Sequence, residues 1–282
     1  MFLSGIADEA GKSIDVQVKA HKELGFTHIE LRTIDGVNCT DLPEDAFEAV
    51  FRTVAEAGLQ VSCFASQLGN WARPISGGFQ TDVAELLRAA PRMHRFGTRF
   101  IRCMSWPNDK EHPLPDAAWR AEAVRRLREL ARIAEANDVV LVHENCDGWG
   151  GRSPEHTLDL IDAVNTPSFK LVFDTGNPVE HCQDGWAFYR AVKAHIVYVH
   201  IKDYLVVEGG GTSACFAGEG RGKVKEILAD LIAGGYGGGV SIEPHLAAVI
   251  HLAQDARDPA QAYRLYVEYG RRAAALVRSL GG

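Results

Sequence analysis

The sequence has no excess of basic residues, no long apolar run and no closely paired cysteines. Its 282 residues include 30 Lys and Arg against 37 Asp and Glu, a formal net charge of −7, which argues against a nucleic-acid surface. No stretch reaches the roughly 20 apolar residues of a membrane span, and the start, MFLSGIADEAG, lacks the basic segment of a signal peptide. The six cysteines form no C-x-x-C pair, which indicates reduced thiols. We expect a cytoplasmic protein with no nucleic-acid or membrane partner, acting on a small, polar, sugar-like substrate.

Eight short apolar runs, each ending in polar residues, alternate with amphipathic segments. They are rich in β-branched and aromatic residues, as strands are, and comprise residues 2–8, 28–32, 60–66, 99–105, 139–145, 170–174, 196–203 and 239–245. The intervening segments have helical periodicity, as in 117–136, and residues 259–280 would form the last helix. No Pro/Ser/Gly linker divides the chain, so residues 1–282 are expected to form one domain. The repeats favour an α/β fold, a (β/α)₈ TIM barrel, over the alternative of a doubly wound open sheet.

The last four runs each end in a potential metal ligand. Active groups of such barrels project from the carboxyl ends of strands, and Glu144, Asp174, His200 and Glu243 occupy those ends. Any one of these residues taken alone is better explained by a solvated strand end or a helix cap. Burying three carboxylates together without a cation would be unfavourable, however. Three carboxylates and one imidazole favour one divalent ion, with Mn²⁺ the first expectation and Mg²⁺ or Co²⁺ the alternatives.

Further residues near these strand ends are candidates for substrate binding. Lys202 and His245 would face the site, although Lys202 has the alternative of a salt bridge to a neighbouring acid. Arg102 would contact a substrate carboxylate or phosphate, or simply pair with Glu30. The loop AGEGRGK (217–223) is a plain turn or a phosphate-binding loop, and it would bring two candidates to the substrate hydroxyls, Glu219 and Arg221. Two tryptophans would form an apolar wall or pack between loops, Trp71 and Trp149.

Several motifs together resemble the sugar phosphate isomerase/epimerase family of xylose isomerase-like TIM barrels, in the AP endonuclease 2 superfamily. They are VHENCDGWGG, VFDTGNP, YVHIKD, GEG and SIEPH, and ADEA and IELR also fit, so that the resemblance covers nearly the whole chain. It implies that Glu144, Asp174, His200 and Glu243 bind one divalent ion, often Mn²⁺, and that the two glutamates are the acid/base pair. Ketose 3-epimerases of the family have His where this chain has Asn177, which is expected to contact substrate instead. The family also suggests a homodimer, with contacts from Trp186, Phe188 or Tyr189.

The resulting prediction is a metal-dependent isomerase or epimerase that acts through an enediolate on a small sugar, sugar phosphate or polyol-derived ketone. A dehydratase or lyase acting on an inosose or a dehydroshikimate-like acid would use the same first step. A DNA repair endonuclease would need a trinuclear zinc cluster and more histidines. A non-catalytic sugar-binding barrel would have no need of both Glu144 and Glu243.

Overall fold

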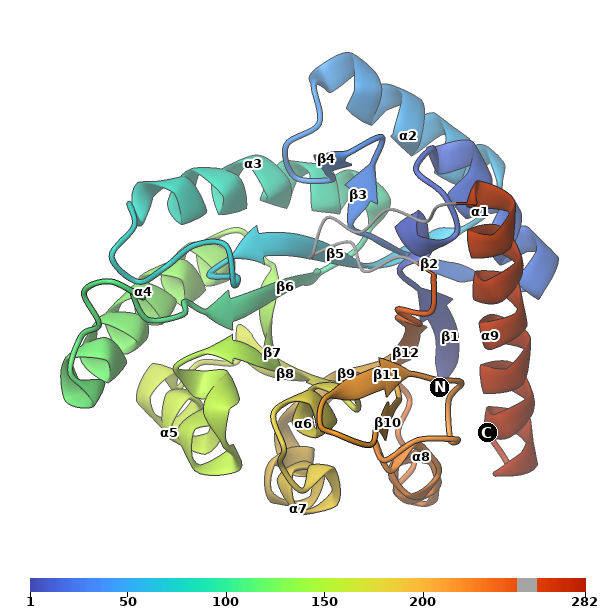
Figure 1. Cartoon of the computed structure of the whole chain (residues 1–282). Coiled ribbons are helices and arrows are strands. Elements are labelled where there is room, and N and C mark those ends of the chain that lie inside the picture. Colours follow the sequence, from blue (N-terminus) through green and yellow to red (C-terminus); the bar gives the residue numbers. More distant parts are fainter. Residues whose placement is uncertain (248–257) are drawn as a thin grey trace.

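Eight strands run parallel around a common axis, where the eight apolar runs predict them (Figure 1). The structure is a computed structural model and describes residues 1–247 and 258–282. The strands are β1 (Phe2–Gly5), β2 (His28–Leu31), β5 (Gln60–Leu68), β6 (Phe100–Ser105), β7 (Val140–Gly148), β8 (Phe169–Asp174), β9 (Ile196–Ile201) and β12 (Gly239–Ile242). Their order is β1-β12-β9-β8-β7-β6-β5-β2, and a parallel bridge between Ile6 and Glu30 brings the two ends together. The nearly closed barrel confirms the predicted fold and excludes the open sheet.

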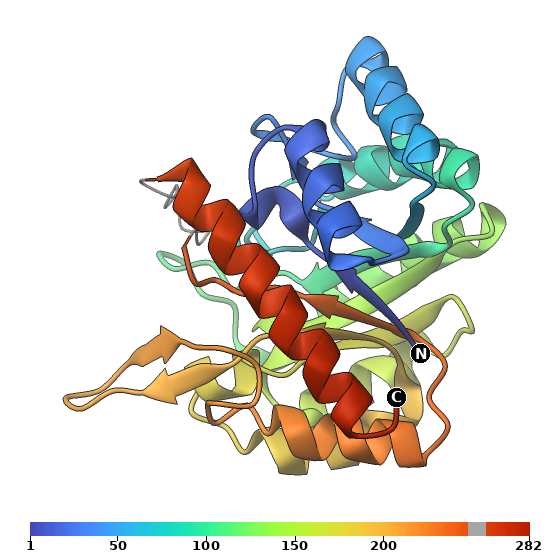
Figure 2. The same ribbon diagram turned by 90° about the vertical axis from the view of Figure 1, so that its right-hand side faces the viewer.

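Helices between the strands cover the outside of the barrel (Figures 1 and 2). They are α1 (Ile14–Leu24), α2 (Glu44–Glu56), α3 (Gln80–Phe96), α4 (Asp116–Ala136), α5 (Pro154–Val164), α6 (Asn177–Glu180), α7 (Gly185–Val192), α8 (Val224–Ala233) and α9 (Pro259–Ser279), with 3-10 turns η1 (Ala7–Glu9), η2 (Gly150–Arg152) and η3 (Lys193–His195). The sequence predicted α4 and α9 to within one residue at each end. Among the described residues, no helix has both the length and the apolar composition needed to cross a membrane.

Local signals set the helix ends. The Ser13 hydroxyl accepts a hydrogen bond from the backbone N–H of Val16 at the start of α1, which satisfies one of the donors that a helix leaves unpaired there. The same helix ends at Gly25, whose φ of 68° is left-handed and therefore suits glycine. These two signals keep α1 short, so that the chain returns to the barrel at β2.

Inward and outward side chains alternate along the strands. A large apolar core lies between strands and helices, and a second, small cluster fills the barrel; its buried members are Cys63, Val142, Val172 and Tyr198. Glu144, Asp174 and His200 each follow one of these interior residues by two positions. Because strand side chains alternate between faces, these three polar side chains also point inward, one layer closer to the carboxyl end.

Two short hairpins extend the carboxyl ends of the barrel. Strands β3 (Thr33–Ile34) and β4 (Val37–Asn38) follow β2, and β10 (Tyr204–Val206) and β11 (Thr212–Ala214) follow β9. Figure 2 shows the β10–β11 hairpin projecting on the side opposite the two chain termini. The hairpins therefore border the mouth of the barrel.

Two of the aromatic residues expected at a dimer contact lie in the core instead. Phe188 and Tyr189 on α7 are each 1% exposed and pack edge-on against Phe173 of β8. Trp186 is partly buried and stacks on Tyr189. Phe188 and Tyr189 are thus unavailable to a partner, and the homodimer itself stays a prediction. All six cysteines are free thiols, as the sequence predicted.

Candidate active site and metal centre

The four predicted ligands meet at the carboxyl end of the barrel. Register places Asp174 beside His200 on β8 and β9, and Ser241 of β12 beside His200, so that Glu243 emerges just beyond. Glu144 comes from β7, next to β8. One ligand atom from each of Glu144, Asp174, His200 and Glu243 lies within 4.8 Å of the others, and all four residues are buried.

The chemistry of this group fits one divalent cation. The donors are three carboxylates and one imidazole, a set that suits Mn²⁺, Mg²⁺ or a similar ion. The Oε2 atom of Glu144 and the Oδ2 atom of Asp174 are buried and accept no hydrogen bond. Each has a basic group only at ion-pair distance, Arg102 for Glu144 and Lys202 for Asp174. Buried carboxylate oxygens that accept no hydrogen bond are costly, and a cation between them would reduce that cost.

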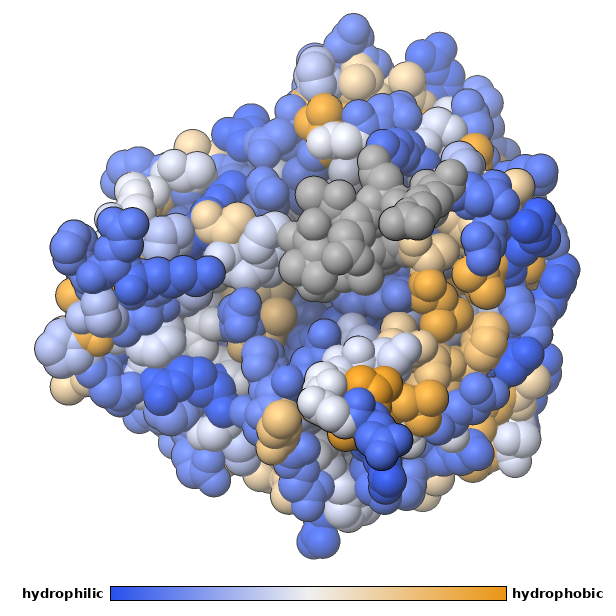
Figure 3. All heavy atoms as spheres, viewed as in Figure 1, coloured by the Kyte–Doolittle hydropathy of each residue, from blue (hydrophilic) through white to orange (hydrophobic). Residues whose placement is uncertain are grey.

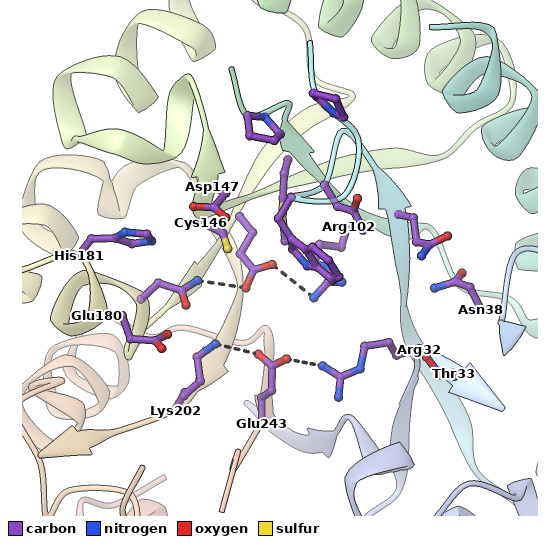
Figure 4. Close-up of a pocket in the computed structure, with 18 of the residues that line it drawn as sticks. Arg32, Thr33, Asn38, Arg102, Cys146, Asp147, Glu180, His181, Lys202 and Glu243 are labelled. Atoms are coloured by element: carbon purple, nitrogen blue, oxygen red, sulfur yellow. Dashed lines mark hydrogen bonds and ion pairs between the residues drawn. The ribbon is translucent and has the colours of Figure 1, made fainter. Parts of the chain in front are cut away.

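Three basic side chains lie against the ligand carboxylates. The Arg102 guanidinium is 3.3 Å from Glu144, and the Lys202 amine is 3.3 Å from Asp174 and 3.4 Å from Glu243. Figure 4 shows Lys202 and Arg32 approaching Glu243 from opposite sides. The alternative that Lys202 forms a salt bridge is therefore correct, although this side chain also lines the pocket.

Burial and these basic neighbours shift the pKa values of the carboxylates in opposite directions. Burial would raise the pKa of Glu144, but Arg102 and His200 lower it to about 2. The pKa of Glu243 is likewise held well below its usual value, because Lys202, His245 and Arg32 outweigh burial. Asp174 differs: burial raises its pKa to about 7, despite the opposing effect of Lys202. The two glutamates are thus ionised, while Asp174 requires a further cation to ionise fully.

A buried carboxylate lies behind His200, the predicted histidine ligand. The Nε2 atom of His200 is 3.1 and 3.2 Å from the two oxygens of Glu30, and both residues are fully buried. The Nδ1 atom faces the ligand set, 3.4 Å from Glu144. Burial alone would lower the pKa of His200, but Glu30 and Glu144 raise it to about 10. Nδ1 is therefore the nitrogen placed to bind a metal, with Nε2–H directed at Glu30.

A pocket of about 800 Å³ opens above this group, within the size range of small-molecule sites. It is lined by Glu144, Glu243, Lys202, Arg102 and Asn177, while Asp174 and His200 lie beneath its floor. Figure 3 shows the molecule hollowed at its centre, with hydrophilic residues inside the hollow and hydrophobic residues along its right and lower right border. The proposed acid/base groups are therefore accessible to a small molecule.

Asn177, which the sequence analysis expected to contact substrate, contacts two of the four predicted metal ligands. Its side-chain nitrogen lies 3.3 Å from Glu144, and its backbone N–H donates to Asp174 at 2.7 Å. The residue starts α6 and lines the pocket. It is thus placed to orient both carboxylates as well as to meet a ligand.

The glycine-rich loop has a different arrangement from the one expected. The backbone N–H groups of Gly218, Gly220 and Gly222 all donate to the Asp203 carboxylate, at 2.8 to 3.0 Å. Glu219 is exposed and pairs with Arg272 of α9, and Arg221 is also exposed. Neither Glu219 nor Arg221 lines the pocket, so the loop closes on a residue of its own chain.

The structure also shows where the other predicted pocket residues lie. Arg102 pairs with Glu144 rather than Glu30. His245 lies 3.4 Å from Glu243 and within hydrogen-bonding distance of the Tyr204 hydroxyl, outside the pocket lining. Trp71 lines the pocket and is 38% exposed, as an apolar wall requires. Trp149 is buried against His156 and packs between elements instead.

The sequence did not assign a role to Arg32, which is central to the site. Its guanidinium donates to both oxygens of Asp8, to Glu243 and to Glu9, so it joins η1 to the ends of β2 and β12. Its position at the end of the second apolar run could have indicated a place at the site. Strand alternation also puts Arg32 on the same face as Glu30.

Comparison with known proteins agrees with this architecture. A family described as xylose isomerase-like TIM barrel matches residues 18–269. The 2-epi-5-epi-valiolone 7-phosphate 2-epimerase of Actinoplanes sp. is 28% identical over 232 residues, which cover 80% of this chain and 77% of that protein.

Solved structures of the same fold cover almost the whole chain. The IOLI protein with a bound zinc atom superposes with a TM-score of 0.77 at 16% identity, over 99% of each chain. The probable 3-DHS dehydratase AsbF of Bacillus anthracis superposes with a TM-score of 0.73 at 17% identity, covering 95% of this chain and 98% of that one. At these identities the superpositions establish a common fold.

Proposed function

The chain belongs to the xylose isomerase-like TIM barrel family, and from this premise we propose that it is a divalent-metal-dependent isomerase or epimerase of a small polyhydroxy ketone. The observation that carries the proposal is the group of Glu144, Asp174, His200 and Glu243, of which the two glutamates line the pocket and the other two lie beneath its floor. Mn²⁺ is the proposed ion, with Mg²⁺ or Co²⁺ as substitutes, because hard oxygen donors dominate the set. The named activity of the Actinoplanes relative, an epimerase, supports the same reaction class.

The ion, when bound, would supply Lewis-acid polarisation of the substrate carbonyl. Glu144 and Glu243 come from β7 and from the end of β12, and both line the pocket as ionised carboxylates. One of them would remove the proton from the carbon beside the carbonyl and become protonated; in an isomerisation this glutamate would return the proton to the next carbon. In an epimerisation the other glutamate would deliver a proton, taken up from solvent, to the opposite face. Their low pKa values make both of them bases at neutral pH before the reaction begins.

The basic residues hold this pair and stabilise developing charge. Arg32 fixes Glu243, and Arg102 fixes Glu144, so that each proton-transfer group has its own cation. Lys202 remains protonated, because Asp174 and Glu243 raise its pKa although burial would lower it. Its amine is therefore able to donate a hydrogen bond to the substrate oxygen that becomes negatively charged in the enediolate.

Solvent exchange tests this function. Metal-loaded protein turning over ketoses in D₂O should place deuterium at the carbon beside the carbonyl. Glu144→Gln and Glu243→Gln should each reduce that exchange by about 10²-fold or more, as expected for loss of a general acid or base. Metal content is measured in the same samples, because both residues are also proposed ligands. Near-normal exchange in both variants with metal bound would refute the scheme.

A dehydratase is the second candidate, supported by the fold shared with the probable 3-DHS dehydratase. It would start with the same proton removal and then expel a hydroxyl as water, with a protonated group assisting. Mass spectrometry of the product separates the two outcomes. An isomerase keeps the substrate mass apart from deuterium, whereas a dehydratase product is lighter by one water.

A further inference from the structure

We propose that the substrate is an uncharged polyhydroxy ketone and that the site discriminates against its phosphorylated form. This inference rests on the proposed function, because it specifies the substrate class of the same pocket. Three independent features carry it: the occupant of the glycine-rich loop, the partners of the buried cations and the charge at the pocket rim.

The first feature is that the natural place for a phosphate is already filled. A barrel binds phosphate through backbone N–H groups of a loop after the seventh or eighth strand. Here the three N–H groups of Gly218, Gly220 and Gly222 converge on the Asp203 carboxylate, just after β9, the seventh barrel strand. A Cβ atom at Gly220 would lie 2.3 Å from an Asp203 oxygen, so the loop closes tightly on this carboxylate. The chain's own anion thus uses the donors that a phosphate would need.

The second feature is that each buried cation lining the pocket is neutralised. Arg32 contacts three carboxylates, Arg102 contacts Glu144, and Lys202 lies between Asp174 and Glu243. An anion entering the floor would compete with these fixed carboxylates for the same N–H groups. A hydroxyl or carbonyl oxygen can accept one further hydrogen bond without that repulsion.

The third feature is the charge of the rim. Among the described lining residues outside the floor, two are lysines, whereas four are carboxylates; they are Lys12, Lys110, Asp109, Glu111, Asp147 and Glu180. The pKa of Asp109 is lowered by hydrogen bonds from the Ser76 hydroxyl and from backbone N–H groups, which keeps it ionised. A phosphate group carrying about two negative charges would meet a net negative rim.

Neutral polar groups complete the lining. Thr33, Gln67 and Asn70 offer hydroxyl and amide groups, and Trp71 presents an indole that is 38% exposed. Such a combination suits a polyol, whose hydroxyls need hydrogen-bond partners and whose C–H faces pack on an aromatic ring. It supplies no compensation for a dianion.

The test compares ketohexoses with their 6-phosphates in D₂O, using metal-loaded protein. We expect kcat/KM for deuterium uptake to favour each neutral ketose by about tenfold or more, the size expected when a dianion approaches uncompensated like charges within a Debye length. Equal or better use of a phosphate ester would overturn the inference while leaving the proposed function intact. If no ketose and no ester exchanges, the proposed function fails instead.

A binding measurement tests the discrimination against a phosphate anion even in that last case. Inorganic phosphate is titrated into metal-loaded protein by calorimetry at physiological salt. Absence of saturable binding at millimolar phosphate supports discrimination against the anion. Saturable binding that is lost in Arg102→Leu would overturn it, because it would reveal a phosphate site at the floor.

Charge removal at the rim provides a matched comparison. The double variant Glu111→Gln/Glu180→Gln should improve kcat/KM for the phosphate ester relative to the ketose several-fold, because it removes two like charges. The control Asp45→Asn/Glu56→Gln changes the net charge equally on the exposed surface of α2 and should leave the ratio unchanged. An unchanged ratio in the rim variant would contradict the electrostatic argument.

Discussion

Replacing Glu30 by glutamine should weaken metal binding although Glu30 is not itself a predicted ligand. Its two oxygens lie 3.1 and 3.2 Å from Nε2 of His200, and both side chains are inaccessible to solvent. A carboxylate behind a ligating imidazole fixes the tautomer and increases the basicity of the other nitrogen. Glutamine keeps the shape and one acceptor oxygen but removes the charge, so the variant isolates the electrostatic contribution.

The magnitude follows from the charges involved. The negative charge of Glu30 also favours the proton that competes for Nδ1, and this proton is held firmly, since the pKa of His200 is raised to about 10. A divalent ion carries twice the charge of a proton, so at similar distances it gains about twice as much from Glu30. The balance therefore still favours the metal. We expect a 10- to 100-fold weaker Kd in Glu30→Gln, about 1.4 to 2.7 kcal/mol, the usual range for such outer partners.

The assay is competition for Mn²⁺ against a chromophoric chelator, with unfolding midpoints measured in parallel. Glu85→Gln is the control, because Glu85 is equally buried but bonds Thr40 and Arg73 rather than a ligand. Glu85→Gln should lower stability and leave the Mn²⁺ Kd unchanged. If Glu30→Gln binds Mn²⁺ within about twofold of the wild type, well below the usual range for an outer partner, the reasoning about His200 is refuted.

Two further predictions concern stability away from the site. Burial lowers the pKa of His21 to about 4 in the folded protein. As pH drops, His21 is therefore protonated in the unfolded chain before it is protonated in the folded one, and the free energy of unfolding should fall from about pH 7 toward pH 4. Between pH 8 and pH 5, the free energy of unfolding measured in urea should fall by about 2 kcal/mol less in His21→Leu than in the wild type. Parallel plots of this free energy against pH for the two proteins would contradict the prediction. Gly220→Ala should lower the unfolding midpoint, because its Cβ would lie 2.3 Å from Asp203 and 2.5 Å from the Tyr204 carbonyl oxygen. Gly237→Ala, where a Cβ meets no atom within 4 Å, is the matched control, and equal midpoints for the two variants would contradict the close contact.

The barrel and the ligand group were accessible from sequence because both depend on local order. An apolar run followed by a charge fixes which residue ends a strand, and alternation fixes which face it shares. Glu144 follows Val142 by two positions, and Val142 packs inside the barrel. The closure of a parallel barrel then brings successive strand ends together without further information. The same logic explains why the ends of α4 and α9 were predicted closely, since capping and periodicity are local too.

Ion pairs between residues on different strands of the barrel cannot be predicted from such local patterns. Arg32 meets Glu243, 211 positions away in the chain, because β1 lies between β2 and β12. Glu30 and Arg32 are two positions apart at the end of one apolar run, so alternation puts them on one face, but nothing in the sequence shows which charges would face them. Arg102 illustrates the same limit: Glu30 and Glu144 were both chemically suitable partners, and only strand adjacency, β6 beside β7, selects Glu144.

The glycine-rich loop shows how this limit reaches function. Its composition left open a plain turn or a phosphate-binding loop, and the structure shows clustered N–H donors, which in such an arrangement bind an anion. Composition cannot reveal whether that anion is a ligand or a residue of the chain, and Asp203 ends the preceding apolar run only fourteen residues before Ala217. Once Asp203 fills the loop, the buried positive charges that line the pocket are those of the floor, each held by a carboxylate. The same pairing that keeps Glu144 and Glu243 ionised as bases therefore also withholds Arg102 and Arg32 from an anionic substrate.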